Sequence, residues 1–578
     1  MQQFQTLARR AAGFLLAVLL VVPAFAAEPS ETAADRQKDL DTLYHEVLEK
    51  HHPNLFAKHT EAEFLQLKAE IEERLKTVSD EEFLLDLQRL TALAGDSHTT
   101  LSIGSAAAGF RGYPFSMVRR GSSWYLSAVS PENEDLLGQE IAAMAGKPVE
   151  EIVAAFGTLF SSDNPVHLRK QFRQACNVAD IYEYLGLVDA GKSLVIRLDS
   201  GKTLSLEPVE RKEMNEMEIV LLSSRVTGTP ETEFAEAYYF AKPLTDSTYY
   251  IQYNTCMEAD DLSMEDFAAK VSEALDAGDY SRILLDLRNN GGGSDGVIWP
   301  LFAAIRTRQL LEGDEVELVG LIGESTFSSA LINAVEIQEM GGVLVGESTG
   351  GSVSHFGAVN TFTLPVSGVR GQISSKYIDL NSLLDAGAGR GVVSLEPDVE
   401  ITQTLEDTLA GKDTCVEWLL AHPEKLAAKE YPDAPLTRGR FIGQLYASLG
   451  APEAAITGLP FADSLGGIEW YLPAMVWAKE TGIARGNAEG NFSAARYLTW
   501  REAAVFLTRA AEFLDVPSPD PSANRYGPVP AALAKGWNQA AVTRAWELGL
   551  LPADADFSGG VTRAQGEAMT AALASLAG

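Results

Sequence analysis

The chain is poor in cysteine, in basic charge and in metal-binding patterns. Its 578 residues contain three cysteines, so at most one disulfide can form, and no pair of them has metal-ligand spacing. The chain has 80 acidic residues and only 46 lysines and arginines, which gives a formal net charge of −34. A surface of this charge repels nucleic acid and anionic membranes. No H-E-x-x-H motif is present and the eight histidines are scattered, so we expect no metal and no other cofactor.

Long apolar runs are also scarce. The one marked run, "AAGFLLAVLLVV", follows Arg9 and Arg10, ends at Pro23 and precedes "AFA". It is short for a bilayer span, and no later run approaches 18 residues. A buried helix is the alternative, but this order of features predicts a secretory signal peptide over residues 1–26. We therefore expect an exported protein with no transmembrane segment once the signal is removed.

Residues 28–103 have the apolar spacing of helices. One stripe is formed by Leu40, Leu43, Tyr44, Val47 and Leu48, and Ser79 with Glu82 forms a capping-box pattern. This part is predicted to be a small helical cap.

Residues 104–212 have shorter, strand-like patterns. Within them, "LLGQEIAAMAGKPVEEIVAAF" resembles the strand, turn and helix of a PDZ domain, a module that binds peptide C-termini by strand addition. Peptide binding by this PDZ-like segment and a purely structural role both remain open.

From residue 213 to 428, strands and helices alternate, which predicts an α/β fold with a largely parallel sheet. The expected strands include "STYYIQY", "SRILLDLR", "EVELVGLIG" and "GGVLVGE". Residues 430–578 are Ala-rich and helical, with a repeated phrase whose threonines stand at 437, 499 and 562. This self-similarity indicates a repeat module.

Two phrases in the α/β part have the composition of a catalytic site. In "DLRNNGGG" a strand runs into Gly291, Gly292 and Gly293, which suits either a tight turn or an oxyanion hole of backbone N–H groups. In "GESTFSSALINA" a strand, a turn and a helix meet, so a serine there lies at the positive end of a helix. The alternative is that Thr326 or Ser328 is only an N-cap.

Together, "DLRNNGGG", "TFSSA", "VGESTGG" and "GDSHT" resemble the tail-specific, or C-terminal-processing, serine peptidases, over residues 36–402. The resemblance implies a crotonase-like α/β core, often with a PDZ-like insert, that hydrolyses polypeptide substrates. It implies that Ser328 is the nucleophile. It also implies an oxyanion hole formed by the N–H groups of Gly292, Gly293 and Ser329.

The sequence departs from the Ser–Lys branch of that family, because Ser352 stands at the lysine position and the next downstream lysine is Lys376. Histidine is the usual alternative base. We expect His98, as in the tricorn-like branch, with Ser97 hydrogen-bonded in the site; His355 is the alternative. Asp96 and Glu347 are the candidates for the third, orienting group. An inactive, peptide-binding homologue also remains possible.

We expect the remaining histidines to be at the surface or structural. They are His45, His51, His52, His59, His167 and His422. Because His98 lies far upstream of Ser328, the site should assemble only when the helical cap docks on the α/β core.

The C-terminal repeats resemble S-layer homology repeats, the first of them partial. The resemblance implies binding to an anionic cell-wall polymer, and therefore a secreted protein held at the cell surface. The arginines that match or neighbour the family's binding position are Arg438, Arg501 and Arg563. Arginine suits this role because its planar guanidinium pairs bidentately with carboxylates. Solvated helix termini are the alternative.

Overall fold

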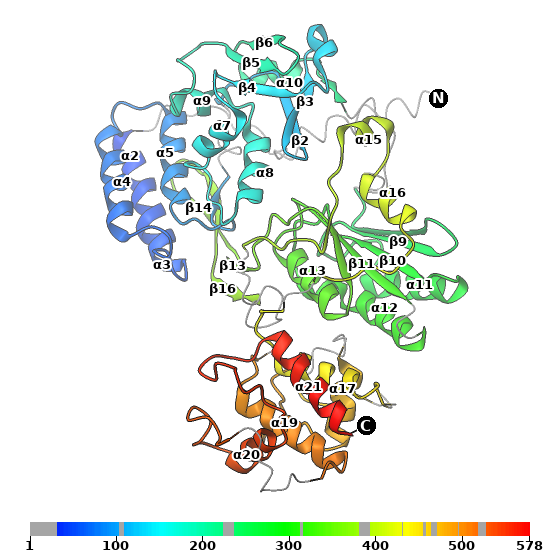
Figure 1. The fold of residues 1–578 in the computed structure, drawn as a ribbon. Helices are drawn as coiled ribbons and strands as arrows, with labels where there is room; N and C mark the ends of the chain where they lie inside the picture. Colours follow the sequence, from blue (N-terminus) through cyan, green and yellow to red (C-terminus); the bar gives the residue numbers. More distant parts are fainter. Residues whose placement is uncertain are drawn as a thin grey trace.

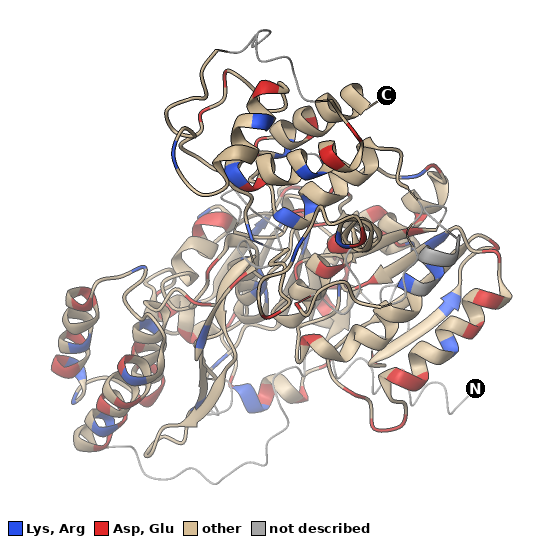
Figure 2. Cartoon of the chain, turned by 90° about the horizontal axis from the view of Figure 1, so that it is seen from below, with Lys and Arg blue, Asp and Glu red and all other residues tan. Residues whose placement is uncertain are grey.

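The computed structural model describes most of the chain beyond its N-terminal 31 residues (Figure 1). The described ranges are 32–102, 109–222, 236–312, 316–380, 393–429, 432–452, 454, 458–463, 471–494, 496–517 and 527–577. The predicted signal peptide lies outside them. No helix in these ranges is long and apolar enough to cross a membrane. Figure 2 shows acidic residues on the helices of every part of the chain, with lysines and arginines between them.

The N-terminal part is helical, as predicted. Its helices are α2 (Ala33–Asp41), a π-helical segment (Thr42–Leu48), α3 (Glu49–His51), α4 (Glu61–Arg74) and α5 (Asp80–Ala92). The predicted stripe from Leu40 to Leu48 is buried. Ser79 caps α5 and forms the predicted capping box with Glu82. The spacing of apolar residues and the capping pattern in the sequence therefore predict the helices of this part correctly.

The middle part contains two small sheets and several helices. The sheets have the orders β2-β3-β7 and β4-β5-β6. The strands are β2 (Phe115–Arg120), β3 (Ser123–Val129), β4 (Ile141–Met144), β5 (Leu194–Leu198), β6 (Thr203–Leu206) and β7 (Val220–Leu221). The helices are η2 (Pro131–Leu136), α7 (Val149–Phe156), α8 (Pro165–Ala175), α9 (Ala179–Tyr184) and α10 (Arg211–Glu216). The PDZ-like phrase forms the expected strand, turn and helix, β4 and α7.

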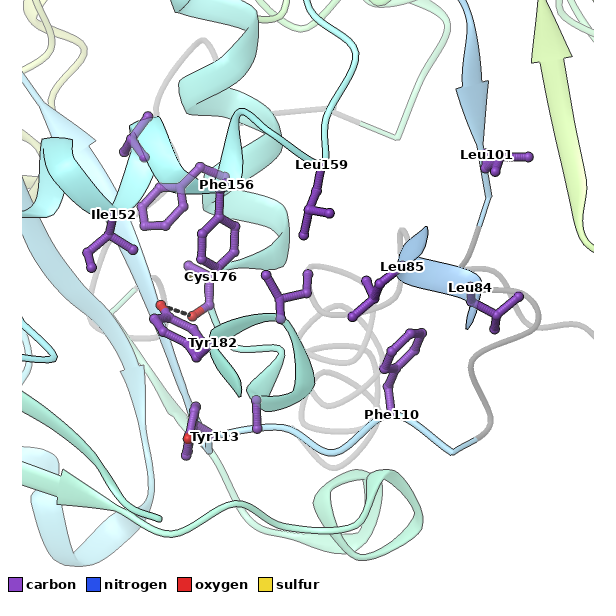
Figure 3. Close-up of a cluster of buried hydrophobic side chains, with 14 of the residues drawn as sticks. Leu84, Leu85, Leu101, Phe110, Tyr113, Ile152, Phe156, Leu159, Cys176 and Tyr182 are labelled. Atoms are coloured by element: carbon purple, nitrogen blue, oxygen red, sulfur yellow. Dashed lines mark hydrogen bonds between the residues drawn. The ribbon is translucent and has the colours of Figure 1, made fainter. Parts of the chain in front are cut away.

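One hydrophobic cluster joins the N-terminal helices to the middle part. Leu84 and Leu85 of α5 belong to the same cluster as Phe156 of α7 and Tyr182 of α9 (Figure 3). The Tyr182 hydroxyl donates to the Cys176 carbonyl at 2.7 Å. A continuous apolar core means that these two parts stabilise each other.

The α/β part is built on a six-stranded sheet of order β17-β12-β11-β10-β9-β8. Its strands are β8 (Tyr239–Pro243), β9 (Thr248–Tyr253), β10 (Arg282–Asp286), β11 (Glu317–Ile322), β12 (Val343–Gly346) and β17 (Val399–Glu400). All neighbours are parallel except β8 and β9, which confirms the predicted parallel sheet.

Both faces of this sheet are covered. Ile283 and Leu285 pack on one side, while Leu284 belongs to a separate cluster on the other. This period of two explains the continuous apolar strands. The helices and helical turns of this part are α11 (Met264–Ala277), η4 (Asp295–Ile298), α12 (Trp299–Glu312), α13 (Ser329–Glu339), α15 (Leu405–Ala410) and α16 (Thr414–Ala421).

An excursion from the α/β part reaches into the N-terminal core. β13 (Ser354–Gly357) pairs with β16 (Lys376–Asp379); β14 (Asn360–Thr363) pairs with β15 (Arg370–Ile373), which also pairs with β1 (Thr100–Leu101). Leu364, Val369 and Ile373 join the N-terminal cluster. The buried Asp39 carboxylate accepts from the N–H groups of Val366 and Ser367 at 2.9 and 2.8 Å. The His98 and His355 rings lie 5.2 Å apart, so residues 96–99 lie beside residues 352–355.

The C-terminal part is all helical in its described residues. Its helices are α17 (Arg438–Ser448), α18 (Leu472–Glu480), α19 (Trp500–Phe513), α20 (Gln539–Glu547) and α21 (Arg563–Ala577). The three repeated threonines accept from the N–H three residues on, at the starts of α17, α19 and α21.

The residues just before those threonines close a ring of hydrogen bonds. Leu436 N–H donates to Val561, Val561 to Leu498, and Leu498 back to Leu436, at 2.8, 3.3 and 2.8 Å. The repeat phrases are thus structurally equivalent, and the partial first copy completes the ring.

Candidate active site

Ser328 occupies a strained position between β11 and α13. Its φ of 54° and ψ of −128° lie in a region that residues other than glycine rarely adopt. Its side chain makes no capping hydrogen bond. The Thr326 hydroxyl is used elsewhere: it donates to the Leu287 carbonyl at 3.0 Å and accepts from Gly323 N–H at 3.1 Å. Ser328 thus stands at the N-cap position of α13, but neither its hydroxyl nor that of Thr326 caps the helix.

The glycine turn packs directly on Ser328. Gly292 has a φ of 104°, and a Cβ added there would lie 2.7 Å from Ser328 Cβ. Gly293 has a φ of 140°, and its Cβ would lie 2.3 Å from the Cys256 carbonyl oxygen. Cys256 holds the turn by accepting from Ser294 N–H at 2.8 Å and donating to the Gly292 carbonyl at 3.0 Å. Only glycine fits these two positions without a shift of the backbone.

The backbone N–H groups of Gly293 and Ser329 are available to form an oxyanion hole, whereas that of Gly292 is not. The Gly292 N–H donates to Asn290 Oδ1 at 2.9 Å, so the prediction that it faces the reacting carbonyl is wrong for this arrangement. The N–H groups of Gly293 and Ser329 make no hydrogen bond to another described residue. Ser329 Oγ donates to the Gly293 carbonyl at 2.9 Å, and Ser329 begins α13, where the helix dipole favours negative charge.

Roughly parallel rings lie next to Ser328. The His98 imidazole stacks on Phe327 with centroids 4.4 Å apart and on His355 at 5.2 Å. His167 also stacks on Phe327, at 4.7 Å. All three histidines are buried. The stack thus joins His98 from the N-terminal part, His167 from the middle part, and the α/β residues Phe327 and His355.

Asp96 anchors the segment that carries His98. Its buried carboxylate accepts from His52 at 3.3 Å, Thr99 at 2.6 Å, Ser374 at 2.6 Å and the His98 N–H at 2.9 Å. Burial opposes ionisation, but the hydrogen bonds from His52, Ser374 and Thr99 outweigh it and lower the pKa of Asp96. Asp96 is therefore ionised.

The His98 imidazole lies near Asp96 but is not hydrogen-bonded to it. Its Nδ1 lies 4.0 Å from Asp96 Oδ1, and neither ring nitrogen has a hydrogen-bond partner among the described residues. Burial, with help from the neighbouring His355 and against the Asp96 charge, lowers the pKa of His98 to about 4. The imidazole is therefore neutral near pH 7 and can accept a proton.

His355 is held by its backbone neighbour. Its Nδ1 lies 2.8 Å from the Ser352 carbonyl oxygen, which fixes the proton on Nδ1 and leaves the buried Nε2 as an acceptor without a partner among the described residues. Burial lowers the pKa of His355. His355 is thus a second neutral imidazole within the stack.

A polar network fills the position of the missing lysine. Ser352 Oγ donates to Asp163 Oδ1 at 2.9 Å and accepts from Asn164 Nδ2 at 3.0 Å. Ser97 Oγ donates to the same Asp163 oxygen at 2.6 Å. Burial raises the pKa of Asp163 against these hydrogen bonds. The sequence predicts a hydrogen bond from Ser97 within the site. In the structure, the Ser97 hydroxyl donates to Asp163.

The carboxylates whose charges act on the two candidate bases are Asp96 and Asp163. Glu347 follows β12, and its N–H donates to the Ile322 carbonyl at 3.0 Å; its orienting role stays a prediction. Asp163 was not among the residues expected in the site, and His52 and His167 were expected only at the surface or in structural roles. No motif marks these three positions, because each reaches the site through a fold contact distant in sequence.

The arrangement suits acyl transfer. At the start of one helix, the hydroxyl of Ser328, whose backbone is strained, lies with two unengaged N–H groups and neutral imidazoles. Attack on a carbonyl needs a nucleophile, a base and donors to the oxyanion, and these groups can supply them. Within the described ranges, no group of three or more His, Cys, Asp or Glu side chains could hold a metal ion.

The three C-terminal arginines make contacts within the chain. Arg438 is buried, donates to Glu502 at 2.6 Å and lies 4.3 Å from the Phe492 ring centre. Arg501 donates to backbone carbonyls, including that of Trp537 at 3.1 Å. The Arg563 N–H donates to the Ala434 carbonyl at 3.0 Å. Arg438 thus links two repeats, and polymer binding by these arginines stays a prediction.

Comparison with known proteins gives matches among solved structures alone. No protein-family model matches the chain, and no curated protein matches it in sequence. It is similar to mature CPAF complexed with lactacystin, with 14% identity and a TM-score of 0.43 over 67% of this chain and 98% of that one.

Two further solved structures are peptidases by their names. The photosystem II D1 C-terminal processing protease has 14% identity and a TM-score of 0.28 over 66% of this chain and 98% of its own. A putative peptidase from Parabacteroides merdae has 15% identity and a TM-score of 0.33 over 68% and 96%. At these low values the likeness does not decide the function, which rests on the geometry of the chain itself.

Proposed function

We propose that the chain is a serine endopeptidase that forms an acyl-enzyme on Ser328 with His98 as general base. The observation that carries this proposal is the strained Ser328, which packs on Gly292 beside the unengaged N–H groups of Gly293 and Ser329. Strain of this kind costs about 1–3 kcal/mol and persists where function requires it.

The residues divide the reaction as follows. The Ser328 hydroxyl attacks the peptide carbonyl while the neutral imidazole takes its proton. The oxyanion that forms accepts hydrogen bonds from Gly293 and Ser329. The imidazolium then protonates the leaving amine, and water deprotonated by the same imidazole releases the acyl group. The ionised Asp96, 4.0 Å from His98 Nδ1, stabilises the imidazolium.

His98 is preferred to His355 because of its place in the stack. His98 lies directly against Phe327, the residue before Ser328, whereas His355 contacts His98 and is fixed by Ser352. The hydrogen bond between His98 and Ser328 would form when substrate binds, since such bonds are often long in unliganded sites.

A fluorophosphonate probe tests the nucleophile. We expect the wild-type protein to be labelled covalently at Ser328 and the Ser328→Ala variant not to be labelled. Ser329→Ala is the comparison variant: it keeps Ser328 and the Ser329 backbone N–H, so labelling at Ser328 should persist, at a lower rate because the hydrogen bond from Ser329 Oγ to the Gly293 carbonyl is lost. Equal labelling of the wild type and Ser328→Ala, or full peptide hydrolysis by Ser328→Ala, would contradict the proposal.

A non-catalytic peptide-binding protein is the second candidate. The observation that favours it is that neither ring nitrogen of His98 has a hydrogen-bond partner among the described residues, so no base is bonded to Ser328; burial also lowers the pKa of His98 to about 4, which makes it a weak base. This candidate predicts that peptides bind with equal affinity to the wild type and to Ser328→Ala, without hydrolysis or labelling of either.

We further propose that the protein is exported by residues 1–26 and held at the cell envelope by residues 430–578. The support is the signal-like N-terminus and the closed ring of hydrogen bonds among the three repeat phrases, the first of which belongs to a partial repeat. The full mature chain should be retained by purified cell wall, and a chain ending at residue 429 should be released. Equal retention of both would remove the anchoring proposal.

A further inference from the structure

One face of the nucleophile helix α13 holds the segment that follows the glycine turn. Ser329 Oγ donates to the Gly293 carbonyl at 2.9 Å. One turn on, Asn333 Nδ2 donates to the Asp295 carbonyl at 3.0 Å and to Glu336 Oε2 at 2.7 Å. Side chains at these spacings share one helix face. The face therefore fixes the turn that presents the Gly293 N–H.

Glu336 closes this set of contacts. Its second carboxylate oxygen accepts from Trp299 Nε1 at 3.1 Å, so the two oxygens bind one donor on α13 and one at the start of α12. The Glu336 carboxylate is buried, whereas Trp299 is 53% exposed. Half of the Trp299 indole faces solvent, but its N–H is bonded to a buried acceptor. The side chain is therefore held more firmly than its exposure suggests.

We infer that Glu336 is a positioning residue whose ionised carboxylate holds the oxyanion turn and Trp299 against the nucleophile helix, and whose protonation loosens that hold. The inference rests on the proposed role of Ser328. A carboxylate accepts hydrogen bonds at both oxygens, so it satisfies both Asn333 and Trp299. A protonated carboxyl presents an O–H toward one of these donors and loses that contact.

The surroundings of Glu336 place this change near neutral pH. The titratable groups that face it are Asp295 of η4, whose charge acts on Glu336, and, after β9, the Cys256 thiol, on which the Glu336 charge acts. Asn333 and Trp299 are neutral donors, and no cation among the described residues acts on it. Burial, opposed by the hydrogen bonds from Asn333 and Trp299 and aided by Asp295, raises the pKa of Glu336 to about 7. The carboxylate is therefore about half ionised near pH 7, and the hold strengthens as the pH rises through that value.

The kinetic test measures kcat and KM of the full-length protein on an unfolded peptide substrate between pH 5.5 and 8.5. In the wild type, kcat should rise through about pH 7 with little change in KM. Burial lowers the pKa of His98 to about 4, so His98 should titrate well below that step. In Glu336→Gln the step should vanish, leaving kcat about tenfold below the wild type at pH 8, because an amide offers one acceptor oxygen.

Two further variants keep the test decisive. Trp299→Phe removes one donor to the carboxylate, so the step should persist with its midpoint moved upward. Glu339→Gln is the matched control: it neutralises another buried carboxylate of α13, one that pairs with Arg440 at 3.0 Å, and should keep the wild-type step. A step unchanged in Glu336→Gln would overturn the inference and leave the peptidase proposal intact.

A readout without catalysis separates the two proposals. The fluorescence difference between Ser328→Ala and Ser328→Ala/Trp299→Phe reports on Trp299 alone and should titrate near pH 7. No titration of that difference would overturn the inference. If the fluorescence titrates while the wild type hydrolyses no peptide, Glu336 holds Trp299 as inferred and the proposed peptidase function fails.

Discussion

Ser328→Ala and His98→Ala are each expected to lower kcat for peptide hydrolysis by roughly 10⁶-fold, and the double variant by little more. The nucleophile and its base act as one unit, so removal of either ends covalent catalysis. The residual rate would come from binding and from the Gly293 and Ser329 N–H groups. The measurement is hydrolysis of a quenched fluorescent peptide at pH 8, with thermal unfolding as the check on the fold.

His355→Ala is the comparison for the choice of base. His355 touches His98 and is fixed by Ser352, so its loss should disturb the stack and cost about tenfold or less. A loss of roughly 10⁶-fold in His355→Ala, with an active His98→Ala, would make His355 the base. Because burial lowers the pKa of His98 to about 4, the imidazole should stay unprotonated, and remain available as a base, down to about pH 5.

The strands and helices could be predicted wherever periodicity was strong. Leu40 to Leu48 repeat at helical spacing and are buried on one face. The apolar strands β9 to β12 fall in the predicted places because both faces of a parallel sheet are covered. The shared core of the N-terminal and middle parts could not be predicted, because the one cluster that contains Leu85 of α5 and Phe156 of α7 joins patterns distant in sequence.

At the candidate site, local chemistry was predictable and long-range contacts were not. The phrase "DLRNNGGG" indicated a turn that needs glycine, and two of its glycines have positive φ values. The same phrase could not show that Asn290 occupies the Gly292 N–H, because that depends on a side-chain rotamer. His167 and Asp163 bear no motif; they reach the site because α8 and the loop before it pack there.

The contacts around Asp96 support the expectation that the site depends on docking of the helical cap. Asp96 accepts from Ser374 of the α/β part, and its N–H donates to Ser161 of the middle part at 2.9 Å. The Asp39 contact with Val366 and Ser367 adds a second link between the same parts. Contacts from the N-terminal part, the middle part and the α/β part together therefore position His98. None of these three parts alone contains the complete site.

Gly292→Ala is expected to lower kcat by about 10²–10³-fold while the protein stays folded, the size of effect seen when an oxyanion donor is lost. The new Cβ would lie 2.7 Å from Ser328 Cβ, 3.0 Å from the Phe327 carbonyl oxygen and 3.1 Å from Ser329 N. These three atoms belong to the nucleophile turn, so relief of the clash must move Ser328 or the oxyanion donors. The φ of 104° adds strain of about 1–3 kcal/mol for any residue with a Cβ.

Gly291→Ala is the matched control, one residue earlier in the same turn. A Cβ at Gly291 meets nothing within 4 Å, so this variant should keep the wild-type kcat and unfolding temperature. Equal activity of the two variants would show that the turn moves freely against Ser328 and would contradict an oxyanion hole here. A loss confined to Gly292→Ala, with unchanged KM, is expected instead, since the displaced N–H groups act on the transition state and not on substrate binding.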